Sequence, residues 1–292
     1  MNEGKSRNYA RAANLIMRNP LTVFGLAIIV VLFLLALFAP YIAPYPEQGQ
    51  GLSNLQERLR PPSLIHPLGT DNLGRDLLSR IIYGARVSLK AAIIVVLIVI
   101  GFGAPLGLIA GYFGGKTDEL IMRFADMILA FPSLLLAIAI VASTGPSLLN
   151  ALVAISVPWW PWYTRLVRGQ VISLKEMQFV ESARALGASK LRIMFRHILP
   201  NCLSPIIVQG TLDMGYIILC LASLGFLGLG TQPPTADWGV MVNDGRAFLL
   251  TQWWISTFPG AAIFVTVLAF NLVGDGLREA LDPKIRWRFQ RA

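Results

Sequence analysis

Long apolar stretches alternate with short polar segments along this chain of 292 residues. A helix of about 20 apolar residues crosses the hydrocarbon core of a bilayer. Pro158 and Pro161 lie inside the fourth stretch, so that helix is expected to be kinked or broken. We expect an all-α integral membrane protein with six transmembrane helices, near residues 21–43, 88–112, 119–143, 148–170, 203–229 and 255–277.

The six stretches also divide the chain into parts. The first stretch is too long for the core of a signal peptide, so it is expected to remain as an anchor. We expect a cytoplasmic N-terminal segment (1–20), a transmembrane anchor (21–43), an extracytoplasmic loop (44–87), a five-helix core (88–277) with a cytoplasmic hairpin (173–200), and a cytoplasmic tail (278–292).

Composition and charge fit this topology. The chain is 55% hydrophobic and 14% charged, whereas soluble domains carry about 25% charged residues. With both termini in the cytoplasm, the inner segments hold most of the 25 Lys and Arg residues, as the positive-inside rule requires. Several basic residues of the outer segment 44–90, such as Arg75 and Arg80, count against that orientation. The basic residues of the inner segments account for the net positive charge of the chain, so this charge does not require a nucleic-acid partner.

Cysteines and histidines give no sign of a disulfide or a metal site. Cys202 and Cys220 fall in one predicted helix, where 18 residues separate their Cα atoms by about 27 Å. A disulfide needs Cα atoms within about 7 Å, so we expect two free thiols. His66 and His197 each stand alone in the sequence, and we assign a metal to neither.

Residues 110–117, AGYFGGKT, fit the loose nucleotide-binding pattern that ends in Gly-Lys-Thr. That chemistry requires a short buried strand before the loop, but a long apolar helix precedes Ala110. The glycines of this helix are expected to allow close helix packing in lipid. We expect a turn here, with Thr117 or Asp118 capping the next helix. The chain is therefore expected to bind no ATP and to hold no cofactor.

The segment 176–201, EMQFVESARALGASKLRIMFRHILPN, predicts two short amphipathic helices on the inner membrane surface. Gly187 suits a left-handed helix C-cap, Ser189 can cap the second helix, and Pro200 is expected to end it. Two interpretations stay open: an interfacial hairpin with a basic face, or a docking knob with small residues at its turn. The two apolar faces have helical spacing: Phe179, Ala183 and Leu186, then Leu191, Phe195 and Ile198.

This segment resembles the EAA loop of ABC importer permeases, in which Glu-Ala-Ala precedes a glycine and, further on, Ile-x-Leu-Pro. Ser182 replaces the first alanine. His197 stands at the isoleucine position with Ile198 beside it, so that apolar contact is expected to shift by one residue. The positions that match in register are Glu181, Ala183, Gly187, Leu199 and Pro200.

Three further segments resemble the dipeptide, oligopeptide and nickel permeases, above all the dipeptide-permease C type. They are HPLGTDNLGRDLLSRIIYGARVSL (66–89), FLGLGTQPPTADWGVMVNDGR (226–246) and LAFNLVGDGLREALDPK (268–284). The resemblance extends over nearly the whole chain and implies the type I ABC importer permease fold. It also implies a permease subunit of a bacterial or archaeal cytoplasmic membrane, without enzymatic activity of its own.

The resemblance further implies partners and a coupling site. The partners would be a homologous sister permease, two ATPase subunits that bind ATP and Mg, and an extracytoplasmic substrate-binding protein. Glu181 is expected to pair with Arg184 or with a basic residue of the ATPase. The coupling helix in an ATPase groove would be formed by Glu181, Ser182, Ala183, Arg184, Ala185, Leu186, Gly187, Ala188, Ser189 and Lys190.

Polar side chains inside the predicted spans are costly and need a partner or water. Gln209 and Asp213 in the fifth span and Asn271 in the sixth either line the translocation pathway or make structural hydrogen bonds between helices. Arg123 and Asp126, near the inner end of the third span, are expected to pair with each other.

The outer segments carry charged residues among turn formers. These residues either contact the binding protein or tie the loops down through local Asp–Arg contacts, and both interpretations stay open. They are Asp71, Arg75, Asp76, Asp237, Trp238 and Asp244.

The sequence leaves the substrate open, because this permease type imports di- and oligopeptides, nickel chelates or glutathione-like compounds. A second class, the self-sufficient secondary transporter, would work without ATPase partners. Internal repeats with charges at the midplane would favour that class, and we find no such repeat in the sequence.

Overall fold

The computed structural model describes Met17 and residues 19–281. Within these residues the chain is helical, and its one extended pairing is an isolated antiparallel bridge between Thr70 and Asp76. The expected cytoplasmic segment at the N-terminus and most of the expected tail lie outside the described residues.

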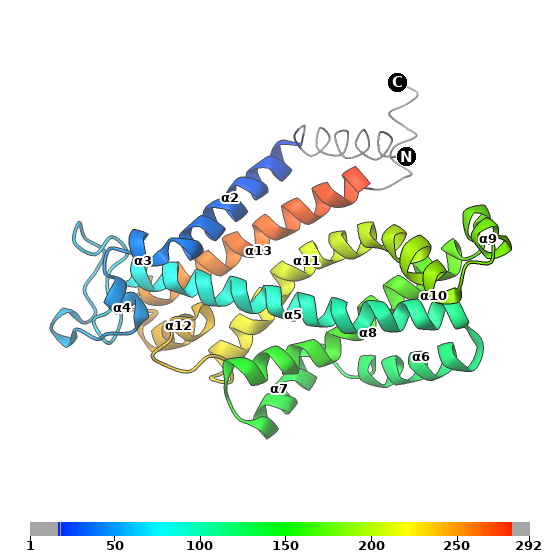
Figure 1. Cartoon of the computed structure of the whole chain (residues 1–292). Coiled ribbons are helices and arrows are strands. Elements are labelled where there is room, and N and C mark those ends of the chain that lie inside the picture. The colour runs from blue at the N-terminus through cyan, green and yellow to red at the C-terminus, as the bar shows by residue number, and fades with distance from the viewer. Residues whose placement is uncertain (1–16, 18, 282–292) are drawn as a thin grey trace.

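Five long helices form the body of the molecule, and shorter helices join them (Figure 1). The long helices are α2 (Pro20–Leu37), α5 (Leu77–Phe113), α8 (Leu148–Leu174), α11 (Leu199–Phe226) and α13 (Trp254–Leu281). At one end lie α3 (Ala39–Ile42), α4 (Pro46–Gln50), η1 (Leu55–Glu57), α12 (Trp238–Gly245) and η3 (Arg246–Phe248). The others are α6 (Gly115–Leu129), α7 (Ser133–Thr144), α9 (Gln178–Ala185), α10 (Lys190–Arg192) and the π-helical η2 (Ile193–Ile198).

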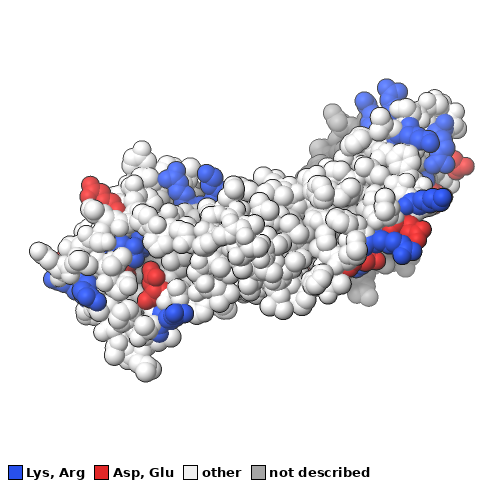
Figure 2. Space-filling model, turned by 90° about the horizontal axis from the view of Figure 1, so that it is seen from below, with Lys and Arg blue, Asp and Glu red and all other residues white. Residues whose placement is uncertain are grey.

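Charged side chains gather at the two ends of the molecule and leave an uncharged belt between them on the face shown in Figure 2. Such a belt is expected where a protein lies in hydrocarbon, because unpaired charges are costly there. Among the residues that the structure describes, four helical stretches are long and apolar enough to cross a membrane, namely α2, α5, the continuous stretch Lys190–Phe226, and α13. The pair α6–α7 is a fifth candidate if its two helices count as one broken span.

The third predicted span, 119–143, is not a single helix. α6 ends at Leu129, α7 begins at Ser133, and the two helices are bent by 82°. Pro132 precedes α7, and its ring and missing N–H prevent α6 from continuing. α8, the fourth predicted span, contains both of its prolines and is not broken. It does not join the candidate spans, because its prolines, tryptophans and arginines lower its mean hydropathy.

α5 begins earlier than the predicted span 88–112. The carboxylate of Asp76 caps it by accepting hydrogen bonds from the backbone N–H and the hydroxyl of Ser79, at 2.8 and 2.7 Å. The helix has 37 residues and is about 55 Å long, whereas the hydrocarbon core is about 30 Å thick. The helix is therefore longer than one crossing requires, and its residues 77–87 lie in the segment that the sequence analysis assigned to the loop 44–87.

α5 and α8 form the centre of the core through a row of glycines on α5. Gly103, Gly107 and Gly111 are spaced by four residues and face α8. A Cβ atom at any of them would lie closer than 3.0 Å to atoms of α8, including the carbonyl oxygens of Trp160 and Thr164. The expectation that glycines allow close packing of this helix is confirmed.

Candidate functional site

The hairpin predicted at 173–200 has its turn where the sequence placed it. Gly187 has φ +78°, the left-handed region. The N–H of Gly187 donates to the carbonyl of Arg184 at 3.0 Å, and the N–H of Ala188 donates to the carbonyl of Ala183 at 3.1 Å. These two bonds form a Schellman motif, which ends α9. The predicted role of Gly187 as the C-cap is confirmed.

The second helix of the hairpin begins as predicted but does not end at Pro200. The Ser189 hydroxyl accepts a hydrogen bond from the N–H of Arg192 at 3.3 Å and so caps α10. Pro200 lies in the first turn of α11, where proline is tolerated, and the helix continues to Phe226.

The π-helical segment η2 lies between α10 and α11, directly before Pro200. Ile198, its last residue, is fully buried, whereas the neighbouring His197 is half-buried. The apolar contact is therefore made by Ile198, one residue beyond the motif position. This bears out the expected shift.

The side of the hairpin that packs on the core is formed by Val180, Ala183, Ile193, Met194 and Ile198, all of them buried. Of the six residues on the two predicted apolar faces, Ala183 and Ile198 belong to this buried side. The other four are exposed: Phe179 (39%), Leu186 (88%), Leu191 (65%) and Phe195 (55%). Apolar residues therefore lie on both sides of these helices. A cluster of exposed large apolar side chains is typical of an interaction surface.

Glu181 is exposed, and it forms no ion pair within the described part of the chain. Its predicted pairing with Arg184 is therefore absent, although both lie on α9 with the expected spacing.

The charged residues near the inner end of α6 pair differently from the prediction. Arg123 contacts Glu119 one turn earlier, with 2.5 Å between Nη2 and Oε1, and not Asp126. Asp126 instead binds Arg165 of α8 at 2.5 Å. The 82° bend after α6 leaves α6 beside α8, so its carboxylates reach across to another helix.

The turn that carries the GGKT sequence joins α5 to α6 directly, and no strand precedes it. Gly114 and Gly115 both have positive φ, +64° and +53°. α6 begins at Gly115 without a side-chain cap, so the prediction that Thr117 or Asp118 caps it is wrong. The geometry thus lacks the strand–loop–helix unit that phosphate binding requires.

Asp213 is buried between α8 and α11. The hydroxyl of Tyr163 on α8 donates to one carboxylate oxygen at 2.6 Å, and the Gln209 amide on α11 donates to the other at 3.0 Å. Only 6% of Asp213 is exposed. The bond from Tyr163 is a structural hydrogen bond between helices, one of the two alternatives that the sequence left open, and the bond from Gln209 lies within α11. Asn271 is exposed, and its amide donates to the carbonyl of Val267 at 2.8 Å.

The outer residues singled out by the sequence are mostly buried. Asp71 and Arg75 form an ion pair at 2.6 Å, and Asp244 lies 3.6 Å from Arg75. Trp238 is fully buried, and its indole N–H donates to the carbonyl of Ile81 at 3.0 Å. These contacts support the interpretation of loops tied down locally. Contact with a binding protein stays a prediction for this region.

His66 has partners that the sequence did not reveal. Its Nδ1 lies 2.8 Å from Asp76, and its Nε2 lies 3.1 Å from Glu57. The imidazole is 1% exposed and so joins η1 to the start of α5. No sequence spacing signals this contact, because the three residues meet only once the outer loop has folded.

Burial raises the pKa of two carboxylates in the segment 237–244. Desolvation raises the pKa of Asp237, although the N–H groups of Val240 and Gly239 donate to it and oppose the shift. Desolvation also raises the pKa of Asp244, against the effect of nearby arginines. A raised folded-state pKa means that the charged form costs stability at neutral pH. That cost begins to shrink as the pH falls through the raised pKa, and it is gone below the ordinary carboxyl pKa, where the folded and unfolded states are both protonated.

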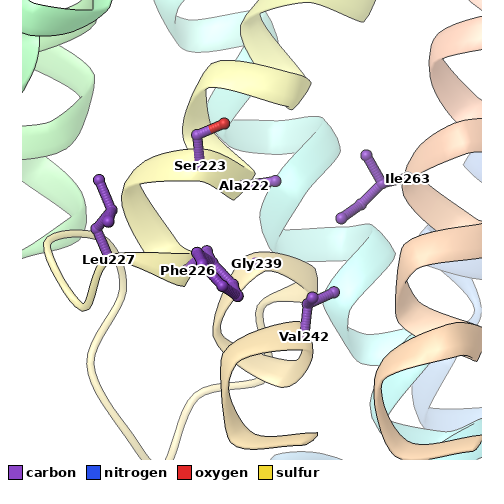
Figure 3. A pocket seen from close by; sticks show the side chains of 7 residues that line it. All are labelled: Ala222, Ser223, Phe226, Leu227, Gly239, Val242 and Ile263. Carbon is purple, nitrogen blue, oxygen red and sulfur yellow. The ribbon is translucent and has the colours of Figure 1, made fainter. Parts of the chain in front are cut away.

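An apolar hollow of about 310 Å³ lies between α11, α12 and α13 (Figure 3). The sequence did not predict it, because its lining comes from three separate segments. The residues around it are Ala222, Ser223, Phe226, Leu227, Gly239, Val242 and Ile263.

Both cysteines are free and buried, as expected.

Comparison with known proteins defines the class of this chain. Residues 103–287 match the family of the "binding-protein-dependent transport system inner membrane component", and residues 10–62 match the "N-terminal TM domain of oligopeptide transport permease C". The first match covers more than half of the chain, so the chain belongs to that family of membrane permeases. It is a subunit of an ABC importer and a transport component, not an enzyme.

Individual relatives narrow the comparison. The chain is 51% identical over 269 residues to the dipeptide transport system permease protein DppC of Alkalihalophilus pseudofirmus, covering 92% of this chain and 88% of the relative. It is 45% identical to the probable D,D-dipeptide transport system permease protein DdpC of Escherichia coli, covering 95% and 92%. It is 44% identical to the glutathione transport system permease protein GsiD of Pectobacterium atrosepticum, covering 92% and 89%.

Solved structures share the fold. An inward-facing conformation of the MetNI methionine ABC transporter matches with a TM-score of 0.56 at 18% identity, covering 70% of this chain and 98% of the other. A second crystal form of the same transporter matches with a TM-score of 0.55.

Proposed function

We propose that this chain is one of two homologous permeases in an importer of short peptides and forms half of the translocation pathway. Relatives named for dipeptides and glutathione, itself a tripeptide, support a short peptide as the substrate. Two ATPase subunits would bind ATP and Mg, and an extracytoplasmic binding protein would deliver the peptide.

We infer a membrane arrangement of six crossings with both termini in the cytoplasm of a bacterial or archaeal cell. The four apolar helices supply four crossings, the bent pair α6–α7 a fifth, and the central helix α8 the sixth. Basic residues around the hairpin, such as Arg184 and Lys190, favour the cytoplasmic side for that end.

Residues 181–190 would couple this permease to an ATPase. This proposal rests on the turn at Gly187, which has a defined left-handed conformation. Exposed apolar side chains flank this turn, which is not packed into the core. Nothing lies within 4 Å of a Cβ atom placed at Gly187, so the turn is open on that side. A groove of the ATPase would close over it and move with ATP binding.

The polar residues of the predicted spans, Gln209, Asp213 and Asn271, would have different roles in transport. The side chain of Asn271 is exposed, and although its amide nitrogen donates to Val267, its amide oxygen would face a substrate or the sister permease. Asp213 would act by holding α8 and α11 together, because it accepts a hydrogen bond from Tyr163 of α8.

The experiment replaces Gly187 with Val and, as a matched control, with Asn. Both add a side chain in open space, but Asn tolerates positive φ and a β-branched residue does not. With the complete transporter in liposomes, Gly187→Val is expected to weaken ATPase binding or to abolish stimulation by peptide-loaded binding protein. Gly187→Asn is expected to retain more of both.

Subunit stoichiometry, stimulated hydrolysis and uptake of a labelled dipeptide are measured side by side. Normal values of all three for Gly187→Val would remove the hairpin from the coupling mechanism. Competition by unlabelled dipeptide, glutathione and a nickel chelate identifies the substrate class. Competition by the nickel chelate alone would refute the peptide assignment.

A further inference from the structure

The turn between α5 and α6, residues 112–117, lies next to the coupling hairpin. The ammonium group of Lys190, at the start of α10, is 5.8 Å from the centre of the Phe113 ring. Figure 1 shows the junction of α5 and α6 at the same end of the molecule as α9 and α10. The turn and the hairpin are therefore neighbours in space although they are far apart in the sequence.

Phe113 is an exposed aromatic residue at a charged end of the protein. It is 49% exposed, and Gly115 and Lys116, the first residues of α6, are exposed as well. Its ring packs edge-on against the ring of Tyr112, with 5.5 Å between the ring centres. Phe113 thus adds an exposed aromatic ring at the end of the molecule where the hairpin exposes large apolar side chains, and exposed apolar residues of this kind mark interaction sites.

The two glycines shape this turn without being required by packing inside the chain. Nothing lies within 4 Å of a Cβ atom at Gly114 or Gly115. Their role is the positive φ that turns the chain sharply from α5, which ends at Phe113, into α6. Directly after the turn, Asp118 binds Arg168 of α8, so the turn is fastened to the helix that leads into the hairpin.

The positive charge of this surface restricts which proteins can bind to it. The turn and residues 178–192 carry the cations Lys116, Arg184, Lys190 and Arg192 against the single carboxylate Glu181. A partner therefore needs acidic side chains around an apolar recess that accepts an aromatic ring.

We propose that residues 112–117 and the hairpin form one continuous docking surface for the same ATPase subunit, with Phe113 as an aromatic anchor. This proposal rests on the proposed function, because it extends the coupling interface. Residues 110–117, whose sequence resembles a nucleotide-binding loop, would thus contact the ATPase subunit and would not bind the nucleotide itself.

The test places the photo-crosslinking residue p-benzoylphenylalanine at one position at a time. The positions are Phe113 in the turn, Leu186 in the hairpin, and Phe102 as a control. Phe102 is 54% exposed, like Phe113, but lies in the middle of α5. The complete transporter in lipid nanodiscs is irradiated, and the crosslinked chains are identified by mass spectrometry.

Crosslinks from Phe113 and Leu186 to the ATPase, with none from Phe102, are the expected result. A crosslink from Leu186 without one from Phe113 would overturn this proposal and leave the coupling hairpin intact. Absence of both would overturn the proposed function as well. A crosslink from Phe113 to the sister permease or to lipid headgroups would also overturn the proposal.

Two variants give a functional readout. Phe113→Asp should weaken association of the ATPase with the permease pair about tenfold, as loss of an aromatic anchor does. Phe113→Tyr keeps the ring and should bind as the unmodified protein does. Equal affinity of Phe113→Asp and the unmodified permease, with normal membrane assembly, would contradict the anchor role.

Discussion

Arg168 of α8 holds Asp118 of α6 through two hydrogen bonds, of 2.5 and 2.6 Å, although 50 residues separate them. A bidentate guanidinium–carboxylate pair fixes orientation as well as distance. α8 ends at Leu174, a few residues before α9, the first helix of the hairpin, begins at Gln178. The pair therefore fastens α6 to the helix that carries the coupling hairpin.

Charge reversal tests this contact. Arg168→Glu should lower the stability of the assembled transporter by about 1 kcal/mol, because two carboxylates then face each other. The double variant Arg168→Glu with Asp118→Arg should recover most of that loss. The measurement is the Tm of the purified complex.

Arg123→Glu serves as the control and should change the Tm little, since the pair of Arg123 with Glu119 is exposed. A double variant no more stable than Arg168→Glu would show that the pair does not contribute.

The hydrogen bond between Tyr163 and Asp213 gives a second prediction. Tyr163→Phe removes the donor from α8 and leaves a buried carboxylate oxygen unpaired, which costs about 1–3 kcal/mol. The Tm of the complex should fall, whereas Asp213→Asn should retain a partner for the hydroxyl and lose less stability. Uptake is measured on the same preparations. Loss of uptake in Asp213→Asn at unchanged Tm would instead favour a direct role in the pathway.

The glycine row on α5 gives a third prediction. Gly107→Val should prevent assembly or strongly destabilise the permease, because a Cβ atom there meets the carbonyl oxygen of Thr164. Gly101→Val is the matched control on the same helix, since nothing lies within 4 Å of a Cβ atom at Gly101. The amount of folded protein is measured by fluorescence-detected size exclusion in detergent. Equal yields for both variants would contradict the close packing of α5 on α8.

A fourth prediction concerns ATP. Residues 110–117 lie between two helices, so an azido-ATP photoprobe should label the ATPase subunits and leave this chain unlabelled. Unlabelled ATP is added in excess as the control for specificity. Saturable labelling at Lys116 would refute the prediction.

The sequence by itself determined the features that depend on local chemistry. Five of the six apolar stretches form long helices as predicted, because in lipid a helix satisfies its own backbone hydrogen bonds, and the third is broken before Pro132. Gly187 and Ser189 marked the two ends of the hairpin turn, because left-handed φ and a capping hydroxyl are local requirements. The long helix before Ala110 excluded a nucleotide-binding loop for the same reason.

Only the tertiary structure decided which side of each helix is buried and which charges meet. Val180 faces the core and Leu186 does not, although both are apolar residues of the hairpin. Asp126 pairs with Arg165, 39 residues away, and not with its neighbour Arg123. Such contacts depend on how two helices cross and where one helix breaks. That geometry is set by packing between distant segments, and the periodicity of any one segment does not contain it.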